Sequence, residues 1–137
     1  MKTSTNSIFS VIAGIVLCCA LGLWLGCSPG ETTYEIGGTV KFAGQPVSEG
    51  TVTFEETATR NTVQAQLGAD GRYSLRVPPG TYRVMVEPPL VAETGVSDAG
   101  MTYKKVDNIP NKFRSSQSTT LTAKVDSAAT LDFELKN

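Results

Sequence analysis

The stretch that most constrains the fold of this chain is 68–89, GADGRYSLRVPPGTYRVMVEPP. Within it, Tyr73, Leu75 and Val77 alternate with polar residues, which is the period of a β-strand with one apolar face. The Pro-Pro-Gly that follows ends this strand, because proline donates no N–H to a sheet, and a second alternating stretch begins at Tyr82. Two strands that share one apolar face must bury it against another layer. The stretch therefore predicts a hairpin within a β-sheet protein.

The same alternation recurs along most of the chain after residue 33. It predicts seven strands, at 34–42, 47–55, 62–67, 72–77, 82–87, 119–125 and 131–135. No stretch in this part of the chain has the period of an amphipathic helix. Because each strand hides one face only, the expected fold is all-β: a seven-stranded antiparallel β-sandwich made of two packed sheets.

The N-terminal segment has a different pattern from the strands. It begins with a short polar stretch that contains Lys2, and from residue 8 to residue 25 every residue except Ser10 is apolar or glycine. This composition predicts an apolar signal helix that directs export, with a retained transmembrane anchor as the alternative. Either role places the sandwich outside the cytoplasm on a tether.

The residues at 23–28, LWLGCS, resemble the lipobox of bacterial lipoproteins, in which a small residue precedes a cysteine that becomes lipidated. The resemblance implies that residues 1–26 are a lipoprotein signal peptide and that Cys27 is the lipidated N-terminus of the mature protein. Residues 27–33 are then a flexible tether, and 34–137 is the folded domain. Two acyl chains on one cysteine anchor a protein stably to a membrane. The implied location is the periplasmic face or the cell surface, and the serine after the cysteine resembles outer-membrane sorting.

Composition argues against several classes of function. The chain has 12 Lys and Arg, 13 Asp and Glu and a net charge of −1, without a long basic run, so we expect no nucleic-acid partner. It contains no histidine, which is the commonest general base and metal ligand. Its three cysteines all lie within the first 27 residues, so we expect no disulfide in the folded domain. We therefore expect a non-enzymatic protein with no catalytic residue, no metal and no cofactor.

The longest part of the domain without strand periodicity is 90–117, and long irregular connections are often functional. Ile109 and Phe113 bracket a proline there, and we expect them to plug an open end of the sandwich. One aromatic ring and four cations are the candidates for contact with a ligand or partner: Tyr103, Lys104, Lys105, Lys112 and Arg114. A cleft between Tyr103 and the loop 90–113 would favour glycan or small-ligand binding, whereas an exposed apolar patch would favour a protein partner.

Two sharper chemical hypotheses compete with structural explanations. A crosslink between Lys41 and Asp132 needs both side chains in the core, but the alternation places both on the outward face. Calcium binding through Asp70 with Asp98 or Asp107 needs several oxygen ligands in one place. Asp70 is better explained as a turn residue whose carboxylate accepts backbone N–H groups. The structural explanation is favoured in both cases.

Several short motifs together resemble the carboxypeptidase regulatory-like domain, a prealbumin-like (transthyretin-like) β-sandwich. They are Gly38-Thr39-Val40, Gly44-Gln45-Pro46-Val47, Thr51-Val52-Thr53-Phe54, 69–75 and 79–84. The tail, with 109–113 and 131–135, is similar to short bacterial lipoproteins that carry one such domain. The resemblance implies a non-enzymatic, lipid-anchored module of the cell envelope, structural or protein-binding. Its partners would be the membrane, through the lipid, and an unknown envelope protein or glycan.

Overall fold

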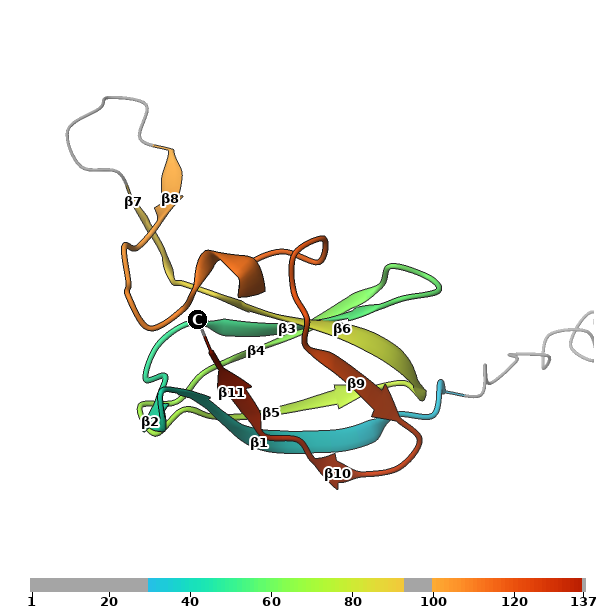
Figure 1. The fold of residues 1–137 in the computed structure, drawn as a ribbon. Coiled ribbons are helices and arrows are strands. Elements are labelled where there is room, and N and C mark those ends of the chain that lie inside the picture. The colour runs from blue at the N-terminus through green and yellow to red at the C-terminus, as the bar shows by residue number, and fades with distance from the viewer. Residues whose placement is uncertain (1–29, 93–99, 137) are drawn as a thin grey trace, which may run out of the picture. The chain divides into compact units, whose positions relative to one another are not determined.

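The structure is a computed structural model that describes residues 30–92 and 100–136. The unit Glu31–Asn137 contains all the described strands (Figure 1). The predicted signal peptide and Cys27 lie outside the described residues. Within the described ranges, no helix is long and apolar enough to cross a membrane.

Across those residues the chain forms eleven strands and one 3₁₀ helix, η1. Their bounds are β1 Tyr34–Phe42, β2 Gln45–Pro46, β3 Thr51–Glu56, β4 Thr62–Gln66, β5 Arg72–Val77, β6 Gly80–Glu87, β7 Leu90–Ala92, β8 Met101–Tyr103, η1 Asn111–Phe113, β9 Thr122–Val125, β10 Ala129–Thr130 and β11 Phe133–Leu135. The predicted count of seven strands is too low. The additional strands β2, β7, β8 and β10 have two or three residues each, which is too short to show a period.

Nine of the strands form two main sheets that stack as a sandwich, and β7 and β8 form a separate two-stranded sheet (Figure 1). One sheet has the order β4-β3-β6-β9, and all its pairs are antiparallel. In the other, β1 pairs antiparallel with β2 and β5 but parallel with β10 and β11. The prediction of a wholly antiparallel sandwich is therefore wrong at the end of the chain. The last strands reach β1 from β9 in the other sheet, so no tight hairpin forces them to run antiparallel.

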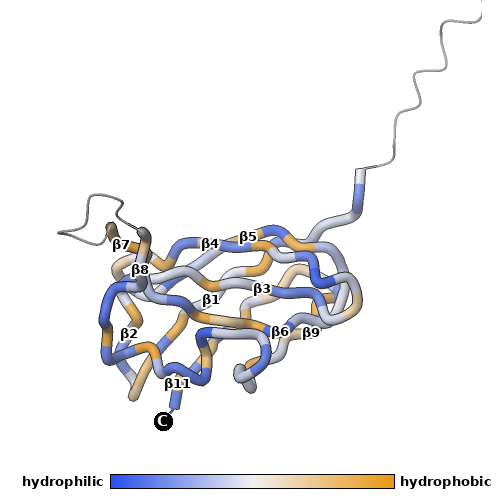
Figure 2. The backbone as a smooth tube through the Cα atoms, turned by 90° about the horizontal axis from the view of Figure 1, so that it is seen from above, coloured by the Kyte–Doolittle hydropathy of each residue, from blue (hydrophilic) through white to orange (hydrophobic). Residues whose placement is uncertain are grey.

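The core lies between the two sheets. Figure 2 shows apolar and polar positions alternating along the strands. The buried apolar side chains of both sheets form one cluster. The ring of Phe54 lies near its centre, with ring centroids 6.0 Å from Tyr73, 5.9 Å from Tyr82 and 6.1 Å from Phe133. Tyr73, Leu75 and Val77, which the alternation places on the apolar face of one strand, all belong to this core, so that assignment is confirmed.

The turn between β4 and β5 follows the chemistry that its sequence indicates. Gly71 has a φ of +73°, and a Cβ there would lie 2.6 Å from the carbonyl oxygen of Val40. The N–H of Gly71 donates to the oxygen of Gly68 at 2.8 Å, and Asp70 Oδ1 accepts the N–H of Arg72 at 3.2 Å. The interpretation of Asp70 as a turn residue is confirmed.

The segment 104–121 covers the edge of β6 that β9 leaves unpaired. Ile109 is fully buried in the core, and Phe113, at the end of η1, is 3% exposed. The hydroxyl of Thr119 donates to the carbonyl oxygen of Val84 on β6 at 2.6 Å, which continues the cover beyond the end of β9. The expected burial of Ile109 and Phe113 is therefore confirmed, although the segment lies along the free edge of β6. We call the segment 104–121 the plug.

Part of the stretch predicted to be irregular, 90–117, is instead a two-stranded ribbon of β7 and β8. Leu90 pairs with Tyr103, and the pairing extends through a hydrogen bond of 2.8 Å from the N–H of Lys104 to the oxygen of Pro89. The ribbon pairs with neither main sheet and projects from one end of the sandwich (Figure 1). Its strands have three residues each, too few to show a pattern in the sequence.

Candidate functional site

The ribbon β7–β8 carries the apolar surface of the domain. Among the described residues, the exposed large hydrophobic side chains all lie on it: Leu90 (53% exposed), Val91 (38%), Met101 (63%) and Tyr103 (48%). Because side chains alternate between the faces of a ribbon, Leu90, Met101 and Tyr103 share one face and Val91 lies on the other. Apolar clusters on an otherwise polar surface mark interaction sites.

A groove of about 420 Å³ lies between the ribbon and the outer face of the four-stranded sheet. Leu90 and Tyr103 form its wall. Its floor and end are lined by Thr51, Gln64, Gln66, Glu87, Pro88 and Pro89. Tyr103 and the beginning of the loop 90–113 thus form a cleft, which was one of the two arrangements considered from the sequence. The other arrangement, an exposed apolar patch, is present on the same ribbon.

Glu87 is the polar centre of this groove. Its Oε1 accepts a hydrogen bond from the hydroxyl of Tyr103 at 2.8 Å, and its Oε2 accepts one from the hydroxyl of Thr53 at 3.0 Å. Gln66 Nε2 donates to the hydroxyl of Thr51 at 3.0 Å. The hydrogen bond to the Glu87 carboxylate, followed by partial burial and the charge of that carboxylate, raises the pKa of Tyr103 above its usual value. The wall of the groove is therefore fixed to its floor.

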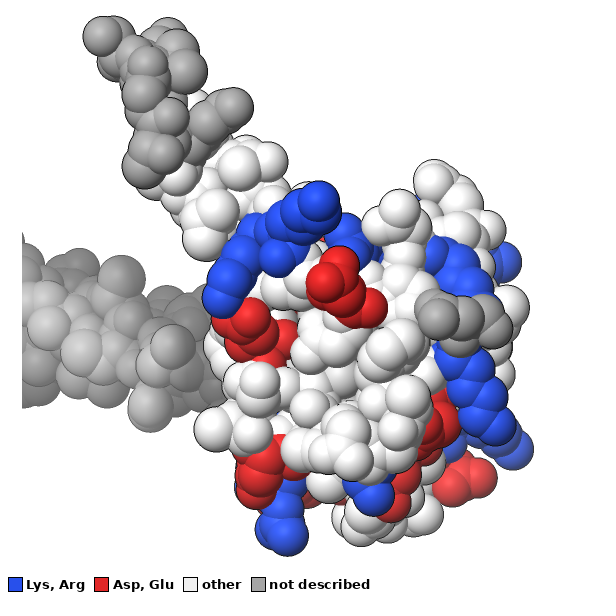
Figure 3. Space-filling model, turned by 60° about the vertical axis from the view of Figure 1, so that its left-hand side comes forward, with Lys and Arg blue, Asp and Glu red and all other residues white. Residues whose placement is uncertain are grey.

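Two of the predicted cations, Lys104 and Lys105, follow β8 directly. The Nζ of Lys104 lies 2.7 Å from Oε2 of Glu49, so its charge is paired. Lys105 is exposed. Figure 3 shows Lys and Arg side chains lying next to Asp and Glu side chains on this face of the molecule. The electrostatic surface here is mixed and offers no field of a single sign.

The other two predicted cations belong to the plug rather than to a binding surface. Arg114 Nε donates to the carbonyl oxygen of Ile109 at 2.9 Å and so closes the turn around η1. The Nζ of Lys112 lies 5.1 Å from the centre of the Phe113 ring, within cation–π distance. Of the five predicted contact residues, only Tyr103 lines the groove.

The sequence interpretation missed the floor of the groove. Thr51, Gln64 and Gln66 lie on outward faces of their strands, which the alternation does indicate. What the alternation does not give is the register, in which Thr51 lies opposite Gln66 on one side and opposite Glu87 on the other. Only this pairing brings four polar side chains from three strands together.

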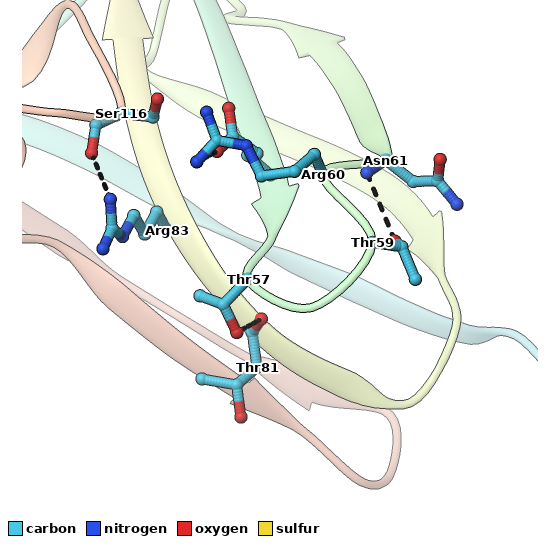
Figure 4. Close-up of polar contacts among 8 residues, drawn as sticks. Thr57, Thr59, Arg60, Asn61, Thr81, Arg83 and Ser116 are labelled. Carbon is cyan, nitrogen blue, oxygen red and sulfur yellow. Dashed lines mark hydrogen bonds and ion pairs between the residues drawn. The ribbon is translucent and has the colours of Figure 1, made fainter.

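A second polar cluster lies near the other end of β3 and has a structural role (Figure 4). Glu55 is only 8% exposed, and its Oε1 forms an ion pair with Arg60 Nη1 at 3.1 Å across the turn from β3 to β4. Arg83 lies opposite Glu55 on β6 and donates to the carbonyl oxygen of Ser116 at 3.0 Å. These contacts hold the β3–β4 turn and the segment after η1 against the sheet.

The alternative chemical hypotheses gain no support from the structure. Lys41 and Asp132 are both exposed, as the alternation predicts. Asp132 Oδ1 accepts hydrogen bonds from the N–H and the hydroxyl of Thr39, both at 2.8 Å, and these lower the pKa of Asp132. No group of three His, Cys, Asp or Glu side chains within the described ranges is arranged to hold a metal ion. Asp98, a candidate calcium ligand, lies outside those ranges.

The groove and the beginning of the domain lie at opposite ends of the sandwich. Strand β3 runs from Thr51, which lines the groove, to Glu56. Glu56 lines a separate pocket of about 320 Å³ together with Glu31 and Thr33, the residues that lead into β1. Figure 1 shows the same arrangement, with the described start of the chain at one end and ribbon β7–β8 at the other.

The solved structures that this chain resembles include proteins from three bacteria. A DUF3823 family protein from Parabacteroides merdae is 14% identical, with a TM-score of 0.44, over 76% of this chain and 46% of that one. The major pilin subunit of Bacillus cereus is 14% identical, with a TM-score of 0.43, over 77% and 30%. The dioxygenase domain of a dioxygenase carbohydrate-binding protein fusion from Streptomyces sp. SirexAA-E is 16% identical, with a TM-score of 0.39, over 82% and 84%. This chain thus spans less than half of the first two proteins.

The assignment to a family comes from the sequence. No curated protein matches it. The family model described as the carboxypeptidase regulatory-like domain matches residues 35–136, which covers the sandwich from β1 to β11 together with the ribbon and the plug. This match agrees with the motif resemblance and with the two-layered fold. The chain therefore belongs to the carboxypeptidase regulatory-like domain family.

Proposed function

We propose that this chain is a non-enzymatic, lipid-anchored module of the cell envelope that binds a protein partner through ribbon β7–β8. The observation that carries the proposal is that, within residues 30–92 and 100–136, the exposed large hydrophobic side chains gather on this one projecting ribbon. The protein is exported and held through Cys27 at the periplasmic face or the cell surface, with the outer membrane as the expected membrane.

The positions of the chain entry and of the ribbon within the domain support this proposal. The chain enters the sandwich at Glu31–Thr33, at the end that lies opposite the ribbon. If a lipid on Cys27 holds the protein, the tether joins the domain at one end and the ribbon lies at the other end. Both strands of the ribbon also have one edge that pairs with no other described strand, and free edges accept further backbone partners.

The groove chemistry supports binding rather than catalysis. The carboxylate of Glu87 accepts hydrogen bonds from two hydroxyl groups, those of Thr53 and Tyr103, which hold it in place. The raised pKa of Tyr103 makes its hydroxyl a weaker acid at neutral pH. The sequence has no histidine to act as a general base near pH 7.

The anchor is tested by intact mass and membrane fractionation of the wild type beside Cys27→Ser. We expect a mature wild-type mass that begins at Cys27 and includes the acyl chains, with the protein in the membrane fraction. In Cys27→Ser the acylated mass disappears. An unprocessed mass that the substitution does not change would instead make the N-terminal segment a retained anchor.

The ribbon is tested by the double variant Val91→Lys and Met101→Lys, compared with Gln45→Lys and Thr122→Lys. All four positions are exposed, but only the first pair lies on the ribbon. Chemical crosslinking on intact cells should recover a protein partner with the wild type and with the second pair. The first pair should reduce recovery by about tenfold, because two charges are placed in an apolar contact. Equal recovery from both pairs would contradict the proposal.

A further inference from the structure

We propose that the groove between ribbon β7–β8 and the four-stranded sheet is a binding site for a neutral saccharide. This inference goes beyond the proposed protein partner, because it concerns a different class of ligand. The proposed protein contact is tested at Val91 and Met101 of the ribbon, whereas the saccharide lies between Leu90 and Tyr103 and the groove floor made by β3, β4 and β6.

The groove has one apolar wall and one polar floor. The wall consists of Leu90 and the ring of Tyr103, which are paired across the ribbon. A pyranose ring has the same division, since its C–H bonds form apolar faces and its hydroxyl groups project around the rim. The C–H face of a sugar fits an aromatic wall, and its hydroxyl groups then point to the floor.

The floor offers donors and acceptors of the kind that hydroxyl groups need. Gln64 and Gln66 are exposed on the same face of β4, and each amide has two N–H donors and one carbonyl acceptor. Gln66 uses its amide nitrogen toward Thr51, which directs its carbonyl oxygen away from that contact. A sugar hydroxyl both donates and accepts, so adjacent amides match neighbouring hydroxyl groups.

The charge of the groove disfavours anionic ligands. Among the described residues, the lining contains no Lys or Arg and a single carboxylate, that of Glu87, so an anion finds no partner there. The hydroxyl groups of Tyr103 and Thr53 orient the Glu87 carboxylate without neutralising it, and its remaining lone pairs can accept hydrogen bonds from a ligand hydroxyl. A purely apolar ligand would leave the polar groups of the floor without partners. A neutral polyhydroxy compound meets both conditions.

The site is held in shape before any ligand arrives. The hydrogen bond from Tyr103 to Glu87 fixes the ring of the wall relative to β6, and Glu87 is itself fixed to β3 through Thr53. Preorganised groups lose less conformational entropy on binding. The volume, about 420 Å³, falls within the range of roughly 300–1,000 Å³ that small-molecule sites occupy.

The test is saturation-transfer NMR on the full chain in dodecylphosphocholine micelles, a detergent without a sugar headgroup. The probes are methyl β-glucoside, methyl β-galactoside and N-acetylglucosamine, with glucuronate and glucosamine as charged counterparts. We expect transfer to the ring C–H protons of at least one neutral probe. Tyr103→Ala, and separately Gln64→Ala with Gln66→Ala, should weaken its binding by about tenfold. Tyr103→Phe keeps the ring but loses the hydrogen bond to Glu87, so it should bind the probe more weakly than the wild type and more tightly than Tyr103→Ala.

The control is Gln45→Ala, an exposed glutamine on β2, which should leave saccharide binding unchanged. No transfer to any neutral probe, stronger binding of a charged counterpart, or undiminished binding by Tyr103→Ala would each overturn the proposal. Val91→Lys changes the opposite face of the ribbon and should keep saccharide binding, while the two glutamine substitutions should keep the crosslinked protein partner. The two proposals thus fail independently.

Discussion

Gly38 shows how a single residue constrains this fold. It lies on the inward face of β1, where the chain crosses from β10 to β11, and the carbonyl oxygen of Leu131 occupies the space of its missing side chain. A Cβ at Gly38 would lie 1.9 Å from that oxygen. The adjacent Gly37 faces outward, and a Cβ there would meet the oxygen of Tyr73 at an ordinary 3.5 Å. A side chain is therefore excluded at Gly38 and accommodated at the adjacent Gly37.

We predict that Gly38→Ala destabilises the domain by about 3 kcal/mol or more, because the backbone at Leu131 must move. Gly37→Ala is the matched control and should change the free energy of unfolding by less than about 1 kcal/mol. Urea unfolding of both variants measures the difference. Equal effects would show that the approach of Leu131 to β1 is wrong.

At the scale of the element, the plug and the ribbon show which structures a local sequence pattern can predict and which it cannot. The hairpin of β5 and β6 was predictable because its alternation and its turn residues lie within one stretch, 68–89. The burial of Ile109 and Phe113 was predictable because these are two large apolar residues in a segment without strand periodicity. Such residues are buried by packing on the sandwich core. The ribbon was not predictable, because three-residue strands leave no period to read.

The plug also explains why loop 104–121 contributes to stability although it lies largely outside the sheets. Phe113→Ala should cost about 3–5 kcal/mol, since it opens a cavity beside β6. Lys112→Ala, one residue earlier and exposed, should cost less than about 1 kcal/mol. Thermal melts of the two variants test the plug, and a small effect of Phe113→Ala would mean that the segment merely rests on the surface.

At the scale of the whole molecule, the pairing between distant strands could not be predicted from the sequence pattern. The parallel pairing of β10 and β11 with β1 joins residues about 90 positions apart, and no local pattern fixes that direction. The groove has the same origin, because the glutamines of β4 meet Glu87 of β6 only through the register of β3. Tyr103 was identified in advance, whereas its polar partners required the fold.

The buried tyrosines make the whole domain less stable at alkaline pH. Burial, followed by the charge of Asp132, raises the pKa of Tyr73, and burial raises the pKa of Tyr82. Their contribution is fully present below the usual tyrosine pKa of about 10 and is lost as pH rises through the folded-state values. Urea unfolding between pH 8 and 11.5 should show stability falling above about pH 10. Tyr73→Phe should make that fall shallower, and an unchanged slope would contradict it.

The central claim is that the domain binds its partner with the end opposite its tether. Its most direct test is photo-crosslinking on intact cells from a photoreactive residue placed at Met101, on the ribbon, or at Asn61, near the tether end. Both positions are exposed, so the reagent itself reaches solvent equally in the two proteins. We predict a discrete crosslinked partner from Met101 and none from Asn61. A partner captured from Asn61 and not from Met101 would place the binding surface at the wrong end and contradict the account.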